Sequence, residues 1–210
     1  MNSETISEPH QRWDALTTRL SISKHDAMYL RLANAYSEKH RHYHTLEHIE
    51  AMLNHFDHYR SLAKEPDSIE LAIWFHDAIY KTRSKSNEED SAEMARSFLT
   101  ENGGDKTVAG KVAAMILATK HDAPIDDPDT ALLVDIDLSI LGAPEPVFWV
   151  FEDNVRKEYF WVPKFLYKKE RRKILQSFLD RYSIYSTDVL KDQLESQAQT
   201  NVAAAIHKLR

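Results

Sequence analysis

The run from Ile69 to Tyr80 places the strongest constraint on the fold of this chain. Its apolar and aromatic residues recur at the three- and four-residue spacing of a helix, and His76 falls on the same stripe. Asp77 follows directly, and a carboxylate aimed toward a core needs a partner because an unpaired buried charge is very costly. A metal ion held by the imidazole and the carboxylate would be such a partner. A core histidine bonded to a backbone carbonyl, beside an aspartate at the edge of the buried face, is the common alternative.

Helical spacing recurs along most of the sequence, and alternating period-two runs bounded by turn residues are hard to find. The 210 residues include only four glycines and seven prolines. We therefore expect an all-α protein that forms one helical domain over residues 1–210, long enough to bury a substantial core. Residues 1–8 are expected to be a loose polar terminus.

Composition excludes several classes of protein and of site. The chain has no cysteine, so any metal would be bound through nitrogen and oxygen rather than thiolate. The net charge of −6 argues against general nucleic-acid binding, which needs a basic face, but it is compatible with a small phosphorylated substrate. No secretory signal pattern opens the sequence and no apolar run approaches about 18 residues, so we expect a cytoplasmic protein without membrane segments.

Histidines are concentrated in one segment, since six of the eleven lie between positions 40 and 58. An apolar helical stripe follows at Ile49, Met52, Leu53 and Phe56. His44 and His48 are four residues apart and are expected on one edge of that helix, where both rings reach one small volume. They could both bind a metal together with a ligand from another helix, or divide metal binding and proton transfer between them. The other four histidines of the segment fit a solvated helix surface.

Two later segments offer further candidates. Ser86 and Glu89 have the spacing of a capping box, which gives Glu89 a structural role and leaves Glu88 available to a site. The helix that they start is expected to stop at the glycine pair 103–104. His121 follows the next apolar helix, at the start of a loop rich in Asp and Pro. A ligand and an ordinary loop histidine are equally compatible with that position.

The segment 130–141 carries the last candidate ligand. Asp137 interrupts its apolar stripe just as His76 interrupts the stripe of the earlier helix, so it too should be paired. Asp135 points roughly to the opposite side. We expect Asp135 to be solvated, or to support a ligand rather than to be one.

In chain order, His48, the His76-Asp77 pair and Asp137 form the pattern H…HD…D, which resembles the HD superfamily of metal-dependent phosphohydrolases. The runs His-Tyr-His-Thr-Leu-Glu-His-Ile, Trp-Phe-His-Asp, Asn-Glu-Glu-Asp-Ser-Ala and Asp-Ile-Asp-Leu-Ser-Ile-Leu-Gly are similar to a bacterial branch described only as predicted HD phosphohydrolases. The likeness covers most of residues 36–200. It implies an HD-type helical bundle with a metal site at its centre.

The resemblance also implies roles for residues. The metal ligands would be His48, His76, Asp77 and Asp137, with His121 as a further candidate. His44 would be the proton donor, as in the similar segment of cyclic-nucleotide phosphodiesterases. No adjacent His-His pair follows downstream, in contrast to HD proteins that bind two metals firmly. The large regulatory domains of the phosphodiesterases are also missing, so no cyclic-nucleotide substrate is inferred.

The ligand set indicates the chemistry to expect. Two imidazoles and two carboxylates suit Mn²⁺, Fe²⁺, Co²⁺, Ni²⁺ or Zn²⁺ better than Mg²⁺. A metal with open positions lowers the pKa of a bound water from ~16 toward ~7 and polarises a phosphoryl oxygen. The expected activity is hydrolysis of a phosphate or pyrophosphate ester of a small molecule, with nucleotides first among the substrates. His44 would protonate the leaving group and Glu88 would orient the water or a second metal.

Two other functions are also compatible with the sequence. One is a metal-dependent sensor, not an enzyme, that binds a nucleotide and signals through a partner. The other is a di-iron oxygenase, since some HD-fold proteins use iron for oxygen chemistry, and this function requires a second metal.

Overall fold

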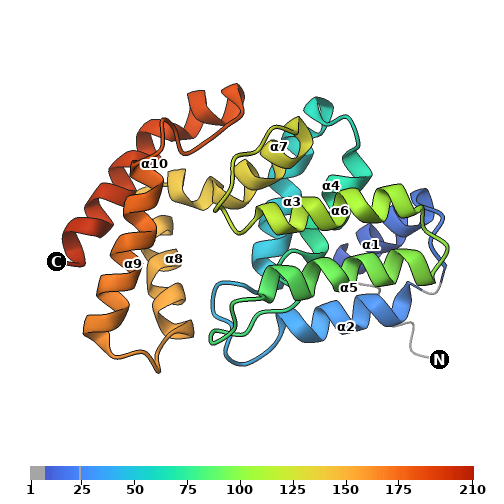
Figure 1. Cartoon of the computed structure of the whole chain (residues 1–210), viewed down its shortest axis with the longest axis horizontal. Helices are drawn as coiled ribbons and strands as arrows, with labels where there is room; N and C mark the ends of the chain where they lie inside the picture. The colour runs from blue at the N-terminus through green and yellow to red at the C-terminus, as the bar shows by residue number, and fades with distance from the viewer. Residues whose placement is uncertain (1–7, 24) are drawn as a thin grey trace. The chain divides into compact units, whose positions relative to one another are not determined.

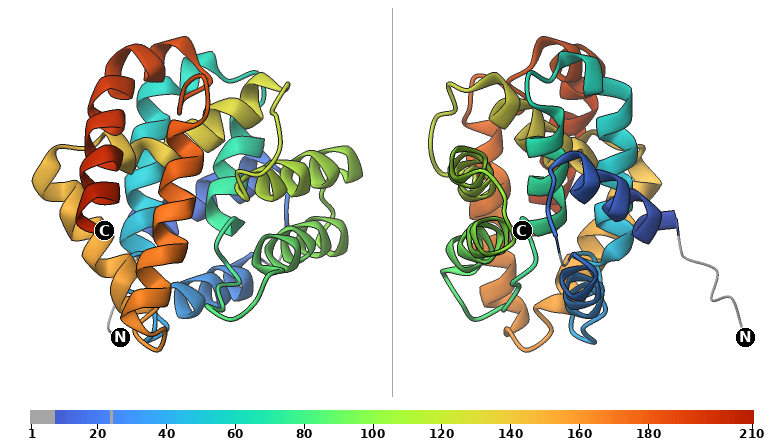
Figure 2. Two further views of the ribbon diagram at one scale, coloured as in Figure 1. Left: turned by 60° about the vertical axis from the view of Figure 1, so that its left-hand side comes forward. Right: turned by 90° about the vertical axis from the view of Figure 1, so that its right-hand side faces the viewer.

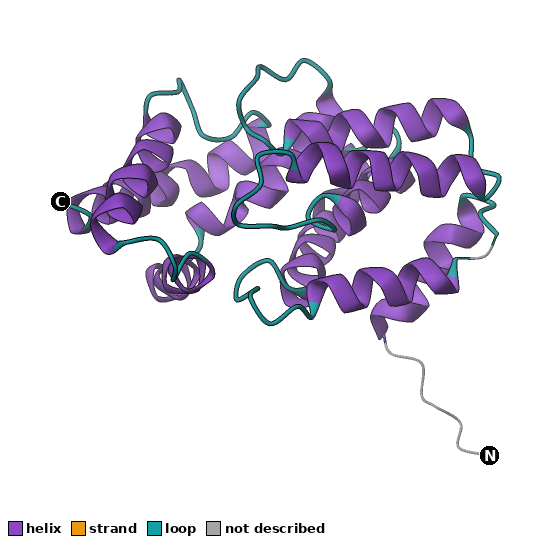
Figure 3. Cartoon of the chain, turned by 60° about the horizontal axis from the view of Figure 1, so that its bottom comes forward, coloured by secondary structure: helices purple, strands orange, loops and turns teal. Residues whose placement is uncertain are grey.

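The computed structural model describes residues 8–23 and 25–210, and every regular element among them is helical (Figures 1 and 3). Residues 1–7 of the expected polar terminus lie outside the described residues. The α-helices are α1 (Glu8–Arg19), α2 (Asp26–Tyr36), α3 (Leu46–Tyr59), α4 (Pro66–Phe75), α5 (Asn87–Glu101), α6 (Lys106–Ala118), α7 (Pro128–Asp137), α8 (Glu145–Glu158), α9 (Lys164–Leu179) and α10 (Asp188–Lys208). Two short 3-10 helices are η1 (Arg60–Leu62) and η2 (Leu138–Gly142). The predicted all-α class is confirmed for these residues, and none of their helices is both long and apolar enough to cross a membrane.

Contacts between Cα atoms divide the chain into two compact units. The first unit comprises Met1–Glu38 and His44–Ile125, and the second comprises Lys39–Tyr43 and Asp126–Arg210. Helices α1 to α6 therefore belong to the first unit, and α7 to α10 belong to the second. A single domain over residues 1–210 stays a prediction.

Helix α4 is the central element of the first unit. Its residues from Ser68 to Phe75 are all buried, and it packs against α1, α3, α5 and α6. A helix that is apolar all round is stable only where other elements cover every face. Trp13 of α1 meets Trp74 of α4 edge-on, with ring centroids 5.6 Å apart, and Phe98 of α5 lies 5.6 Å from Phe75. This aromatic cluster fixes the end of α4 that leads into His76.

Helix α4 ends at Phe75, so the prediction of a continuous helix to Tyr80 is wrong. Two side chains form hydrogen bonds with backbone carbonyls that would accept from backbone amides in a longer helix. The Tyr36 hydroxyl donates to the Trp74 carbonyl oxygen at 2.8 Å, and His76 Nδ1 lies 2.9 Å from the Ile73 carbonyl oxygen. His76 therefore occupies the helix C-cap, and Asp77 lies in the turn that follows.

Helices α5 and α6 lie side by side in the first unit (Figure 2). The predicted capping box at the start of α5 is wrong, because the Ser86 hydroxyl donates to Asp90 at 3.3 Å and Glu89 forms an ion pair with Lys120 of the chain after α6. The predicted stop is confirmed, because Gly103 has φ +87°, a left-handed conformation that glycine adopts without steric cost.

In the second unit, α9 and α10 lie side by side (Figure 2), and α10 also packs on η2. Close approach explains the glycine that ends η2, because a Cβ atom at Gly142 would lie 2.7 Å from Leu194 Cβ. The Asn201 side-chain amide donates to the carbonyls of Leu141 and Ala143, each at 2.8 Å. The chain that follows α7 is therefore fastened to α10.

Candidate metal centre

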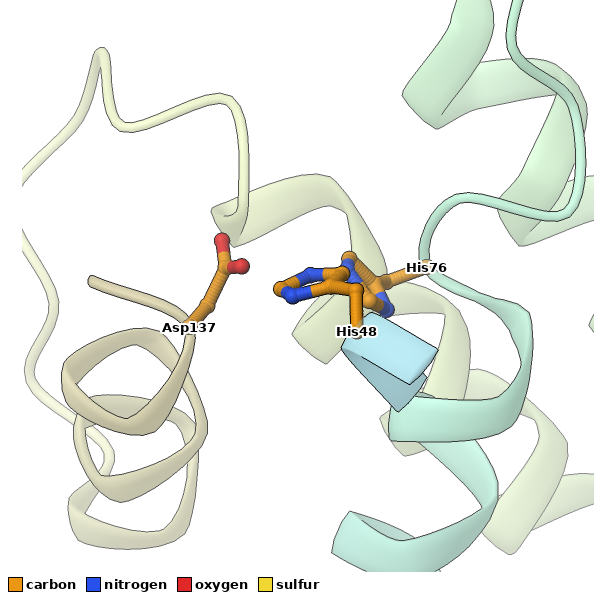
Figure 4. Close-up of side chains that lie close together, drawn as sticks. All are labelled: His48, His76 and Asp137. Carbon is orange, nitrogen blue, oxygen red and sulfur yellow. The ribbon is translucent and has the colours of Figure 1, made fainter. Parts of the chain in front are cut away.

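Two buried imidazoles of the first unit face each other. His48 lies in the first turn of α3 and is 7% exposed, and His76 at the C-cap of α4 is 2% exposed. Their Nε2 atoms are 3.3 Å apart, and the two rings are drawn together in Figure 4. The sequence prediction that these histidines come from separate helices and reach one place is confirmed.

Asp77 brings a carboxylate to the same place. Its Oδ2 lies 3.1 Å from His76 Nε2 and 4.0 Å from His48 Nε2. The bond from His76 Nδ1 to a backbone carbonyl requires a hydrogen on Nδ1, so in neutral His76 the Nε2 atom carries a lone pair. That lone pair would lie 3.1 Å from the Asp77 carboxylate oxygen, and two such acceptor atoms repel each other unless a cation bridges them. A cation, either a proton or a metal ion, therefore belongs among these atoms.

The three atoms fit a metal ion in size. A triangle with sides of 3.3, 3.1 and 4.0 Å has a point about 2 Å from all its corners, which matches metal–nitrogen and metal–oxygen bonds of ~2.0–2.2 Å. That point lies in the plane of the three atoms, so any further ligand would bind above or below this plane. His76 also donates its other ring N–H to a backbone carbonyl, as metal-binding histidines usually do. This largely buried His-His-Asp group could hold a metal ion.

Electrostatics keeps Asp77 ionised. Burial alone would raise the pKa of the Asp77 carboxyl. The positive charges of His76, His44 and His48, with a hydrogen bond from His76, outweigh burial and hold that pKa well below its ordinary value. Asp77 is therefore a carboxylate, which is the form that binds metal.

His44 lies at the edge of this group, but not on a helix. Helix α3 begins at Leu46, after Thr45 in an extended conformation (φ −110°, ψ 177°), so the prediction that His44 and His48 share one helix edge is wrong. His44 Nε2 is nevertheless 4.0 Å from Asp77 Oδ2, and its ring stacks on Tyr80 with centroids 4.2 Å apart. The side chain is 21% exposed, so His44 lies near the half-buried Asp77 carboxylate and also reaches solvent.

Asp137, the third side chain drawn in Figure 4, belongs to the second unit. It is the last residue of α7 and is half-buried. The next carbonyl along the chain, that of Leu138, accepts a hydrogen bond from the Tyr185 hydroxyl at 3.1 Å. The backbone that carries Asp137 is therefore held firmly within its unit.

Asp135 is not solvated, so that part of its prediction is wrong. The residue is fully buried, and its carboxylate accepts hydrogen bonds from the Ser186 amide at 2.9 Å and from the Thr187 amide and hydroxyl at 2.6 Å each. These bonds anchor the end of α7 to the start of α10. No local pattern could have indicated this role, because Thr187 is 52 residues away.

Glu88 and His121 lie near one ion pair of the first unit. Glu88, in the first turn of α5, is half-buried and precedes Glu89, whose partner is Lys120. His121 follows Lys120 with φ +59°, in the left-handed region. Neither residue belongs to a group of three His, Asp or Glu ligand atoms within 4.8 Å of one another in the described part of the chain.

Sequence reasoning missed Tyr36, which ends α4 and so sets the position of His76. It lies 38 residues before the carbonyl that it binds, and its spacing marks it only as an apolar-face residue of α2. Tyr80 was predicted as part of a core stripe; it is buried, and its ring also stacks on His44.

No family model matches the chain, and neither a curated protein nor a solved structure gives a significant match.

Proposed function

We propose that this chain is a metal-dependent phosphohydrolase that cleaves phosphate or pyrophosphate esters of small molecules, with nucleotides as the first class to test. The observation that carries the proposal is the convergence of His48 Nε2, His76 Nε2 and Asp77 Oδ2, 3.3, 3.1 and 4.0 Å apart, around one buried point. The H…HD…D order of the sequence, which resembles HD phosphohydrolases, supports the reaction class.

We propose Asp137 as the fourth ligand. Two features support this role: it is a half-buried aspartate in a sequence motif similar to that of the HD superfamily, and hydrogen bonds hold the backbone around it. With Asp137 the donor set becomes two imidazoles and two carboxylates, whose combined charge balances a divalent ion. This set favours Mn²⁺, Fe²⁺, Co²⁺, Ni²⁺ or Zn²⁺ over Mg²⁺. When bound, such an ion lowers the pKa of a water that it holds and polarises a phosphoryl oxygen.

His44 is proposed to give a proton to the leaving oxygen of the substrate. Its ring is oriented by the stack on Tyr80, and its Nε2 lies 4.0 Å from the Asp77 carboxylate. Partial exposure leaves that imidazole within reach of a molecule entering from solvent. A leaving alkoxide or phosphate needs this proton, and a positioned general acid typically contributes ~10²–10⁴-fold to the rate.

The proposal extends to Glu88, which would orient the attacking water, and to His121, which would add a ligand for a second ion. The ion pair between Glu89 and Lys120 supports this extension, because it ties the start of α5 to the end of α6 and so brings Glu88 and His121 into one region. A second ion would bridge or assist the first in phosphate displacement.

The test is phosphate release by protein freed of metal and then loaded with each candidate ion. A panel of nucleotides and p-nitrophenyl phosphate should be hydrolysed, and His76→Ala and Asp77→Asn should abolish release. His55→Ala is the matched control, because His55 is exposed on α3, the helix that carries His48. Tight nucleotide binding without phosphate release, for every ion tested, would indicate a nucleotide sensor rather than a hydrolase. Full activity in His76→Ala would show that this site does not carry out the reaction.

A further inference from the structure

A second group of metal-binding side chains lies in the first unit and shares no residue with the site above. His10 and Asp14 are one turn apart on α1, and His25 and Asp26 adjoin each other at the start of α2. The sequence does not predict this group, because its two halves come from different helices. Taken alone, His10 and His25 look like ordinary surface histidines.

Each imidazole nitrogen faces both carboxylates at nearly equal distance. His10 Nε2 lies 3.5 Å from Asp14 Oδ1 and 3.6 Å from Asp26 Oδ1. His25 Nδ1 lies 3.3 Å from Asp14 Oδ1 and 3.6 Å from Asp26 Oδ1. Among the described residues, His10 Nε2, Asp14 Oδ1 and His25 Nδ1 are buried atoms that make no hydrogen bond. Three polar atoms are thus turned inward toward one another with their bonding capacity unused.

The separations of His10 from Asp14 and Asp26 fit ligand atoms held around one metal ion. Bonds of ~2.0–2.1 Å to a tetrahedral ion place the ligand atoms about 3.3–3.4 Å apart. The separations of 3.5 and 3.6 Å fall just above that value. A direct ion pair between an imidazolium and a carboxylate would close to ~2.7–2.9 Å instead. The geometry points to a metal site made of His10, Asp14 and Asp26, whose ligand atoms all lie within 4.8 Å of one another, with Zn²⁺ as its ion.

The scaffold holds these ligands in place without the ion. The His10 ring stacks on Tyr29 of α2, with centroids 4.1 Å apart and planes 4° from parallel. The carbonyl of His25 accepts a hydrogen bond from Trp13 Nε1 at 3.1 Å. The stack orients the His10 ring, and the hydrogen bond fixes the backbone next to Asp26. Two carboxylates also balance the charge of a divalent ion.

The site has a structural role, because its three protein ligands come from two helices. It joins α1 to the start of α2, and α1 carries Trp13 of the aromatic cluster around α4. Bound zinc should therefore stabilise the first unit.

The test uses protein carrying His48→Ala, so that the central site does not contribute. In this background we expect about one equivalent of Zn²⁺ per chain, and Co²⁺ in its place should show the intense visible bands of tetrahedral coordination. Adding Asp14→Asn or Asp26→Asn should weaken zinc binding by at least ~10²-fold and remove those bands. His207→Ala is the control, because His207 is exposed on α10.

Stability supplies a second readout. Saturating zinc should raise the Tm of the His48→Ala protein by about 5 °C and leave that of the two aspartate variants unchanged. Circular dichroism checks that each variant is folded before metal is added. Equal zinc affinity in the His48→Ala protein with and without the aspartate substitutions, or weak octahedral-type Co²⁺ bands in it, would overturn the proposed site.

Discussion

At the scale of single residues, two histidines of one motif have different surroundings. His48 is buried in α3 against His76, whereas His44 precedes the helix, stacks on Tyr80 and reaches solvent. The sequence predicted that both would reach one small volume. It placed His44 on the helix because nothing in the spacing shows that Thr45 is extended.

The different surroundings of His44 and His48 predict different losses on substitution. His48→Ala should empty or loosen the metal site, because it removes a ligand. His44→Ala should keep the metal and lower turnover by ~10²- to 10⁴-fold, the usual range for loss of a general acid. The loss should be smaller for p-nitrophenyl phosphate, whose leaving group needs little protonation. Metal content and turnover on poor and good leaving groups are the measurements.

The outcomes for His44→Ala are distinct. Loss of metal would make His44 a ligand, and unchanged turnover on every substrate would leave it without a role.

Substitutions of Asp135 and Asp137 should have different effects. Asp137→Asn should weaken metal binding and leave the fold intact. Asp135→Asn should lower the free energy of unfolding by about 1–3 kcal/mol, because it disturbs buried hydrogen bonds to Ser186 and Thr187. Metal titration and urea unfolding of both variants are the measurements. Equal losses of metal affinity in the two would contradict the assignment of Asp137.

The lowered pKa of Asp77 predicts how stability depends on pH. A carboxyl whose folded pKa lies below its unfolded value of ~3.9 stabilises the fold above that pH, and the stabilisation is lost as the pH falls through the folded pKa. In metal-free protein, the unfolding free energy of wild type should exceed that of Asp77→Asn at about pH 5. The difference should shrink below about pH 4. Urea unfolding across this range is the measurement, and a difference that grows on acidification would be the opposite result.

At the scale of elements, the apolar spacing predicted that helices exist but not where each one ends. Most of the buried face of α4 could be read from its sequence, as could the glycine stop after α5. The end of α4 could not, because it depends on a hydroxyl from α2, 38 residues earlier. The prediction of a capping box was wrong for a similar reason, since Glu89 pairs with Lys120, which follows α6.

Tyr36 should therefore affect the site without touching a ligand. Tyr36→Phe removes the bond to the buried Trp74 carbonyl, which should cost about 1–3 kcal/mol of stability. It should also weaken metal binding, because His76 lies two residues after that carbonyl. The control is Tyr182→Phe, since Tyr182 is 96% exposed. Thermal unfolding and metal titration are the measurements. Wild-type metal affinity in a destabilised Tyr36→Phe protein would mean that the end of α4 does not set the site.

At the scale of the molecule, composition predicted the all-α class, and residue order predicted which side chains to examine. The first unit confirms that His48, His76 and Asp77 come together. What the sequence could not supply are contacts between distant segments, such as the carboxylate of Asp135 on Thr187 and the four-residue group at the start of α1 and α2. Such contacts depend on tertiary packing, and the spacing of residues along the sequence does not indicate them.

The central claim is that His48, His76 and Asp77 hold a metal ion, and metal content tests it most directly. The measurement compares zinc per chain in Asp14→Asn/Asp26→Asn protein, which lacks the second site, with and without His76→Ala. We predict about one equivalent without His76→Ala and less than about a tenth with it, while His55→Ala in the same background keeps the full equivalent. Equal zinc content with and without His76→Ala would contradict the claim.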